Sequence, residues 1–189
     1  MSGLLNPNEV VKKLPVIPSM VIADFGAGSG FFSIALAKAL NNNGKVIALD
    51  IWPKALEALQ TRAKIEKVWP VIETKIADLE KPNGSKLTSE SVNMVLISNM
   101  LFQTENKINI LKEAKRILQK DGFLVIIDWD PQKLPNKENL FPIDKNKINK
   151  TILDMGFKFK EIKISSLNLK PISKIVLFIL FLFMGNKFS

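Results

Sequence analysis

Short apolar runs alternate along this chain with longer stretches whose apolar residues recur every three or four positions. The first pattern is typical of buried strands, and the second is typical of amphipathic helices. Strands are expected near 20–24, 45–50, 70–76, 92–98, 122–128, 157–164 and 174–183. Helices are expected near 6–13, 30–41, 53–67, 105–119 and 144–155. This alternation predicts βαβ units, and therefore an α/β fold with a doubly wound, mostly parallel sheet.

A glycine-rich turn joins the first strand to the helix that follows it. The strand runs into Asp24, and Gly26, Gly28 and Gly30 come directly after it. Glycine allows positive φ and has no side chain, so a ligand can lie against the backbone at the strand's carboxyl end. A dinucleotide fingerprint would need a small residue where Phe31 stands, and there is no P-loop lysine motif. A tight turn without a ligand remains the alternative.

Two further predicted strands also end in an acidic residue. Asp50 ends the second strand, where a carboxylate can accept hydrogen bonds from both ribose hydroxyls of a nucleoside. The alternative is that Asp50 caps the helix that begins at Pro53. Asp78 ends the third strand, and its alternative is an ordinary turn before Pro82.

The pattern D-x-G-x-G-x-G, with these acids behind it, resembles the first motif of the class I S-adenosylmethionine-dependent methyltransferases. The resemblance covers roughly residues 15–165, including the stretch ILKEAKRILQKDGFLVIIDW. It implies a seven-stranded Rossmann-like sheet with an antiparallel last strand, and S-adenosyl-L-methionine as cofactor. The cofactor-binding residues that it implies are Asp24, Gly26, Gly28, Gly30, Asp50, Ile51, Trp52, Asp78, Leu79, Ser98 and Asn99.

Candidate catalytic residues are few, because the chain contains no Cys, His or Tyr. Without them there is no thiolate nucleophile and no thiolate zinc site, and two common general bases are missing. Asp128 and Asp130 follow the fifth strand and are the leading candidates for a base, with a polar strand end as the alternative. Two carboxylates are too few to support a metal site, so none is predicted.

The formal net charge of +9 raises the question of a nucleic-acid partner. Of the 27 basic residues, only Arg62 and Arg116 are arginines, whose planar fork is the better reader of phosphates and bases. The chain also has Ser98-Asn99-Met100-Leu101 where amino-directed base methyltransferases carry an Asn/Asp-Pro-Pro-aromatic run. A nucleic-acid substrate is therefore not favoured.

The carboxyl-terminal segment departs from the family pattern. Residues 175–184 form an apolar run that is too short to cross a bilayer, because a transmembrane helix needs about 20 residues. A strand buried on both faces has the same pattern, so 171–189 is expected to hold the last strand of a single domain, 1–189. Peripheral membrane contact through this tail is the alternative. No secretion signal is recognisable at the amino terminus, so a cytoplasmic location is expected.

The resulting hypothesis is methyl transfer to O, N or C of a small-molecule acceptor, with a lipophilic molecule such as a quinone precursor among the candidates. Two alternatives stay open. One is a non-catalytic S-adenosylmethionine-binding or scaffold protein, and the other is an RNA or protein methyltransferase. The loops at Phe102–Glu105 and Trp129–Leu140 are expected to border the acceptor site.

Overall fold

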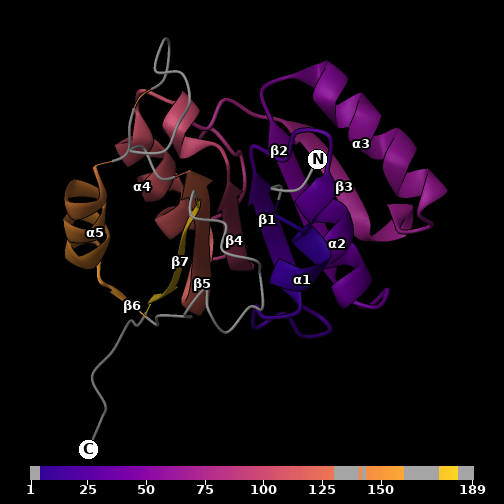
Figure 1. Cartoon of the computed structure of the whole chain (residues 1–189), viewed down its shortest axis with the longest axis horizontal. Coiled ribbons are helices and arrows are strands. Elements are labelled where there is room, and N and C mark those ends of the chain that lie inside the picture. The colour runs from indigo at the N-terminus through magenta and orange to yellow at the C-terminus, as the bar shows by residue number, and fades with distance from the viewer. Residues whose placement is uncertain (1–4, 130–140, 142–143, 160–174, 183–189) are drawn as a thin grey trace, which may run out of the picture.

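The computed structural model describes residues 5–129, 141, 144–159 and 175–182 (Figure 1). Its helices are α1 (Pro7–Val11), α2 (Phe31–Ala39), α3 (Pro53–Ile65), α4 (Lys107–Ile117) and α5 (Lys145–Asp154), with the 3₁₀ turns η1 (Trp69–Val71) and η2 (Leu101–Gln103). Its strands are β1 (Val21–Phe25), β2 (Lys45–Asp50), β3 (Ile72–Ile76), β4 (Val92–Ser98), β5 (Leu118–Trp129), β6 (Phe157–Phe159) and β7 (Ile175–Leu182). Helices α1 to α5 and strands β1 to β5 lie where the hydrophobic pattern predicts them.

The strands are ordered β3-β2-β1-β4-β5-β7-β6. Strands β1 to β5 are parallel to their neighbours among these five, and β7 is antiparallel to both β5 and β6. The strand order reverses between β1 and β4, as expected for a doubly wound sheet. An open α/β sheet binds ligands in the crevice at such a switch point.

The start of β5 corrects one expectation. The pattern predicts a helix through 119, a turn at Asp121-Gly122 and a strand from 122, but β5 already begins at Leu118, which pairs with Val92. The pairing then shifts register and resumes at Phe123, with Asp121 at a φ of 63° inside the irregularity. Leu118 and Phe123 are five positions apart, whereas their partners Val92 and Met94 are two positions apart. The predicted turn is therefore an irregularity of three extra residues within the strand, which does not end the ladder.

Helices cover both faces of the sheet. Successive side chains of a strand point to opposite faces, and apolar residues on both faces must be covered. Ile22, Val46 and Met94 point into one core layer with α1, α2 and α3. Their neighbours Ala23, Ile47 and Val95 point into the opposite layer with α4 and α5 (Figure 1). Buried apolar side chains of both layers hold the parallel strands in register, so their carboxyl ends meet along one edge.

Backbone hydrogen bonds join these carboxyl ends to the loops that leave them. The amides of Gly26 and Ala27 donate to the carbonyl of Leu49 at 2.8 and 3.0 Å. The amide of Ala77 donates to the carbonyl of Asp50 at 2.9 Å. The glycine-rich turn, the end of β2 and the segment after β3 therefore lie beside one another. Across the described ranges, no helix is long and apolar enough to cross a membrane.

Candidate functional site

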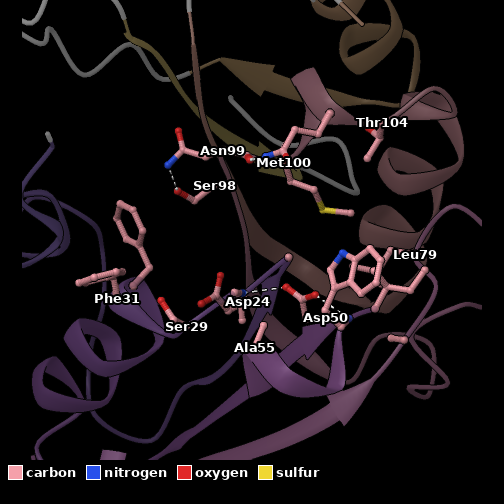
Figure 2. Close-up of a pocket in the computed structure, with 18 of the residues that line it drawn as sticks. Asp24, Ser29, Phe31, Asp50, Ala55, Leu79, Ser98, Asn99, Met100 and Thr104 are labelled. Carbon is pink, nitrogen blue, oxygen red and sulfur yellow. Dashed lines mark hydrogen bonds between the residues drawn. The ribbon is translucent and has the colours of Figure 1, made fainter. Parts of the chain in front are cut away.

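A cavity of about 840 Å³ opens at this edge of the sheet (Figure 2). Its size is in the range of natural small-molecule sites. Segments after β1, β2, β3 and β4 contribute to its wall, together with parts of α1, α2, α3 and η2. The lining residues are Leu5, Pro7, Asp24, Gly26, Ala27, Gly28, Ser29, Phe31, Phe32, Asp50, Ile51, Trp52, Ala55, Ala77, Asp78, Leu79, Glu80, Ser98, Asn99, Met100, Gln103 and Thr104.

The glycine-rich turn forms the floor between β1 and α2. Gly26, Gly28 and Gly30 have φ values of 68°, 54° and 84°, in the left-handed region that favours glycine. A Cβ added at Gly28 would meet nothing within 4 Å, whereas one at Gly26 would lie 2.9 Å from the sulfur of Met100. The backbone at Gly28 is therefore open to a ligand in the cavity.

Asp50 connects the end of β2 to this turn. One carboxylate oxygen accepts the Gly28 amide at 2.8 Å, and the other accepts the Trp52 amide at 2.9 Å (Figure 2). Each carboxylate oxygen has a second lone pair. The predicted ribose acceptor therefore lies in the cavity wall, oriented by two backbone amides and able to accept further hydrogen bonds.

Asp24 lies beside Asp50 and is almost fully buried. Burial raises the pKa of Asp24 to about 7, and the neighbouring Asp50 carboxylate adds to the rise. The Ser33 hydroxyl donates to Asp24 at 2.5 Å and opposes it. The Asp24 carboxyl group therefore changes charge near neutral pH, and a cation in the cavity would favour its ionised form.

Apolar side chains flank the next part of the wall. Ile51 and Trp52 are 52% and 71% exposed, and Leu79 is buried. Asp78 accepts the Glu80 amide at 3.2 Å and pairs with Lys81 at 3.0 Å. The exposed indole and the Asp78 carboxylate suit a flat heterocycle that carries an amine.

The opposite side of the cavity is formed by the end of β4. Figure 2 shows Ser98, Asn99 and Met100 across from Asp24 and Asp50. Asn99 has a φ of 51°, its carbonyl accepts from Gln103 at 2.8 Å, and its side-chain NH₂ donates to the Ser98 hydroxyl at 3.3 Å. The Asn99 Oδ1 atom is buried and has no hydrogen-bond partner.

Two predicted site residues do not line the cavity, and a third lies outside the described residues. Gly30 is buried at the first turn of α2, and a Cβ there would lie 2.4 Å from Leu59, so its role is close packing. Asp128 is buried and accepts the Leu101 amide at 2.9 Å, which holds η2 against the end of β5. Asp130 lies outside the described residues, as does most of the predicted loop Trp129–Leu140.

Several lining residues were not predicted from the sequence. Phe31 is 60% exposed at the mouth, and the guanidinium of Arg62 lies 4.0 Å from its ring centroid. An exposed aromatic residue directly after the last glycine is the signal that could have identified it. Leu5, Pro7 and Glu80 have no such signal, because only the packing of α1 and the path after β3 bring them here.

Comparison with known proteins identifies the family. A family model described as "Methyltransferase domain" matches residues 18–167, which is most of the chain. The chain belongs to this methyltransferase-domain family. The motif order after β1 to β4 identifies it further as a class I S-adenosylmethionine-dependent methyltransferase, an enzyme family whose cofactor is S-adenosylmethionine.

One relative of this chain is demethylmenaquinone methyltransferase of Alkalihalophilus pseudofirmus. It is 27% identical over 135 residues, which cover 70% of this chain and 55% of the relative. The matched part thus spans about half the length of that relative.

Solved structures show the same fold. An S-adenosylmethionine-dependent methyltransferase from Aquifex aeolicus superposes with a TM-score of 0.76 at 19% identity, covering 95% of this chain and 90% of that one. Geranyl diphosphate C-methyltransferase from Streptomyces coelicolor, solved with Mg²⁺, geranyl diphosphate and S-adenosyl-L-homocysteine, superposes with a TM-score of 0.73 at 11% identity. It covers 93% of this chain and 79% of that one.

The residues of this cavity fit S-adenosylmethionine on structural grounds. Gly28 leaves the backbone open, Asp50 retains acceptor capacity, and Trp52 presents a flat apolar surface. A positively charged ligand would favour the ionised form of the buried Asp24 carboxyl group.

Proposed function

We propose that this protein transfers a methyl group from S-adenosylmethionine to O, N or C of a compact, lipophilic small molecule. The observation that carries the proposal is the single cavity wall that unites the Gly26–Gly28 turn, Asp50, Trp52 and Asp78. The names of the relatives support a small-molecule acceptor, since demethylmenaquinone and geranyl diphosphate are both small molecules with a long hydrocarbon part.

The cofactor-binding half would use the residues on the β1, β2 and β3 side. Asp50 would accept from both ribose hydroxyls, while Trp52 and Leu79 would flank the adenine and Asp78 would accept from its exocyclic amine. The backbone of Gly26 and Gly28 would contact the methionine part. Bound S-adenosylmethionine supplies a methyl group on a positively charged sulfonium.

In the proposed transfer, the acceptor atom forms a bond to the methyl carbon while the carbon–sulfur bond breaks, and the acceptor proton passes to water or to a base. The chain's main contribution would be orientation, because holding two reactants in line lowers the barrier without a strong base. Met100 covers Gly26 and therefore lies where the two halves of the cavity meet.

A general base is a separate part of the proposal. Asp128 is not among the residues that line the cavity. We propose that its role is structural, because its carboxylate accepts the Leu101 amide and so holds η2 in place. Asp130 stays a prediction as the base. Lys107 holds the same loop from the other side, since its Nζ donates to the Thr104 carbonyl at 2.5 Å.

The alternative of a nucleic-acid substrate gains no support from the arginines. Arg116 donates to Glu113 and to the carbonyl of Leu87, both at 2.8 Å. Arg62 stacks on Phe31. Both guanidinium groups are therefore engaged within the protein.

The proposal includes the family's complete seven-stranded sheet, with β7 as an antiparallel strand between β5 and β6 and the whole chain 1–189 as one domain. The pairings of β7 with both neighbours support it.

Incubation with methyl-labelled S-adenosylmethionine and fractionated metabolite extracts tests the activity. We expect label in a product that partitions into organic solvent and that is absent with an Asp50→Ala variant. Cofactor binding without transfer to any extract would instead favour the non-catalytic scaffold. Label in RNA or protein would favour those acceptors.

A further inference from the structure

The charge of the cavity lining is opposite to the charge of the molecule. The chain has 27 basic and 18 acidic residues, yet the charged residues among the described lining are Asp24, Asp50, Asp78 and Glu80. No lysine or arginine contributes to that part of the wall. Because basic residues predominate elsewhere, this distribution is specific to the cavity.

Neighbouring cations neutralise only part of this charge. Lys81 pairs with Asp78 from an exposed position at 3.0 Å. Lys107 is near enough to interact with Glu80, but its Nζ donates to the Thr104 carbonyl and lies 5.4 Å from the ring centroid of Phe141. Neither lysine lines the cavity, so neither is placed to bind an anion inside it.

A bound cofactor would compensate only part of the negative charge of the cavity lining. S-adenosylmethionine carries two positive groups and one carboxylate, so its net charge of about +1 compensates only part of the lining. An anionic acceptor would then find no lysine or arginine in the described lining, and an unpaired buried charge is costly.

The acceptor half has a different chemistry. Phe31, Phe32 and Met100 supply apolar surface to the cavity, and Asn99 also lines it. The Oδ1 atom of Asn99 is buried and unpaired, while the other end of the amide is bonded to Ser98. Because an amide can be turned end over end, one of its two ends lacks a partner in either orientation. A buried unpaired amide group is costly, and a ligand polar group can satisfy it.

We infer that the methyl acceptor is an uncharged, carbon-rich molecule with a hydroxyl or N–H group that hydrogen-bonds to Asn99, and that the cavity rejects phosphorylated and carboxylated molecules. This inference rests on the proposed function and narrows its substrate class. Glu80 contacts the loop that precedes α4, because its carboxylate accepts a hydrogen bond from the Asn106 amide at 3.0 Å. It therefore contributes to the rejection of anions.

Equilibrium dialysis with probes that share one ring system tests the inference. The probes are 2-naphthol, 2-naphthoate and 2-naphthyl phosphate, each measured on the full chain alone and with saturating S-adenosylhomocysteine. At neutral pH and moderate salt, we expect 2-naphthol to bind at least about tenfold more tightly than either anion. The family resemblance placed Asn99 with the cofactor, whereas its amide is here assigned to the acceptor. Asn99→Ala should therefore weaken 2-naphthol by a larger factor than S-adenosylhomocysteine.

Two matched variants test whether the charge of the cavity lining causes the rejection of anions. Glu80→Gln keeps a hydrogen-bond acceptor for Asn106 and should narrow the preference for 2-naphthol over 2-naphthoate by roughly threefold. Glu90→Gln removes the same charge at an exposed position outside the lining and should leave the preference unchanged.

Tighter or equal binding of either anion, or no binding of 2-naphthol, would overturn the inference. So would equal effects of the two glutamate substitutions. Titration with S-adenosylhomocysteine alone is a separate readout. Its failure would refute the methyltransferase proposal, whereas the probes would still report on charge selection by the free cavity.

Discussion

At the scale of single residues, two neighbouring carboxyl groups have different environments. Asp50 accepts two backbone amides at the cavity wall, while Asp24 is buried behind it with one hydroxyl donor. Fixed amide donors stabilise a carboxylate, and burial disfavours it. Burial thus makes the charge of Asp24 responsive to pH and to bound cations.

Replacing Asp50 by Ala should weaken binding of S-adenosylhomocysteine by on the order of 1.5–3 kcal/mol, because a charged acceptor for two hydroxyls is lost. Isothermal titration calorimetry measures this change. Asp154→Ala, an equal change at an exposed position in α5, serves as the control. Equal affinity in wild type and Asp50→Ala would remove Asp50 from the site.

The buried Asp24 predicts a pH dependence of stability. Its folded-state pKa of about 7 lies above the ordinary 3.8, so the folded protein binds the proton more tightly than the unfolded chain. This contribution is fully present below about pH 4 and is lost as pH rises through about 7. The difference of about three units sets an upper estimate of about 4 kcal/mol.

Asp24→Asn should therefore remove this decline, so that the stability of the variant relative to wild type increases between about pH 4 and pH 7. Denaturant unfolding of the ligand-free protein at several pH values gives the difference. Asp121→Asn, at an exposed position, should show no such trend. A constant difference between Asp24→Asn and wild type across this range would mean that Asp24 is not a high-pKa group.

At the scale of elements, the glycine-rich turn combines two separate requirements. Gly28 faces open space, and Gly30 packs against α3 at the start of α2. Both have positive φ, so an L-residue is strained at either position. Only the second position is also closed sterically. Ligand approach and helix packing are therefore separable by mutation.

We expect Gly28→Ala to fold with a loss of about 1–2 kcal/mol and to bind S-adenosylhomocysteine at least about tenfold more weakly. Gly30→Ala should lose roughly 2–4 kcal/mol, because its Cβ also displaces Leu59. Thermal melts and titrations of both variants separate these effects. Unchanged ligand affinity in Gly28→Ala would show that no ligand lies against this backbone.

At the scale of the whole molecule, the carboxyl-terminal strand β7 completes the sheet. Strand β7 pairs along β5 from Phe123 to Trp129 and also pairs with β6, so it lies inside the sheet rather than at its edge. A strand with neighbours on both sides uses its backbone donors and acceptors in two ladders. Removing it would leave two unpaired strand edges.

A chain that ends at Leu169 should therefore be insoluble or unfolded. Exposed apolar surface costs about 25 cal/mol per Å², and domains are stable by only about 5–15 kcal/mol. Circular dichroism and size-exclusion chromatography test the truncation, and liposome sedimentation of the intact chain tests the alternative. A folded truncation that binds S-adenosylhomocysteine, together with an intact chain that sediments with liposomes, would favour a peripheral membrane anchor.

The helices, the parallel strands and the position of the glycine-rich turn follow from the sequence alone. These features depend on local periodicity and on glycine at positive φ, which neighbouring residues encode. The sequence also indicated that Asp24, Asp50 and Asp78 share one edge, because every strand of a parallel sheet ends on the same side.

The tertiary structure alone decided which side chains share the cavity. Leu5 and Glu80 are far apart in the chain and meet there through the packing of α1 and the loop after β3. Asp128 ends a strand as the other acids do, yet its carboxylate holds the Leu101 amide. Glu80 adds a fourth acid to the three that the sequence placed at this edge. Local pattern specifies the direction of a side chain within its element, whereas distances between elements depend on how their faces pack.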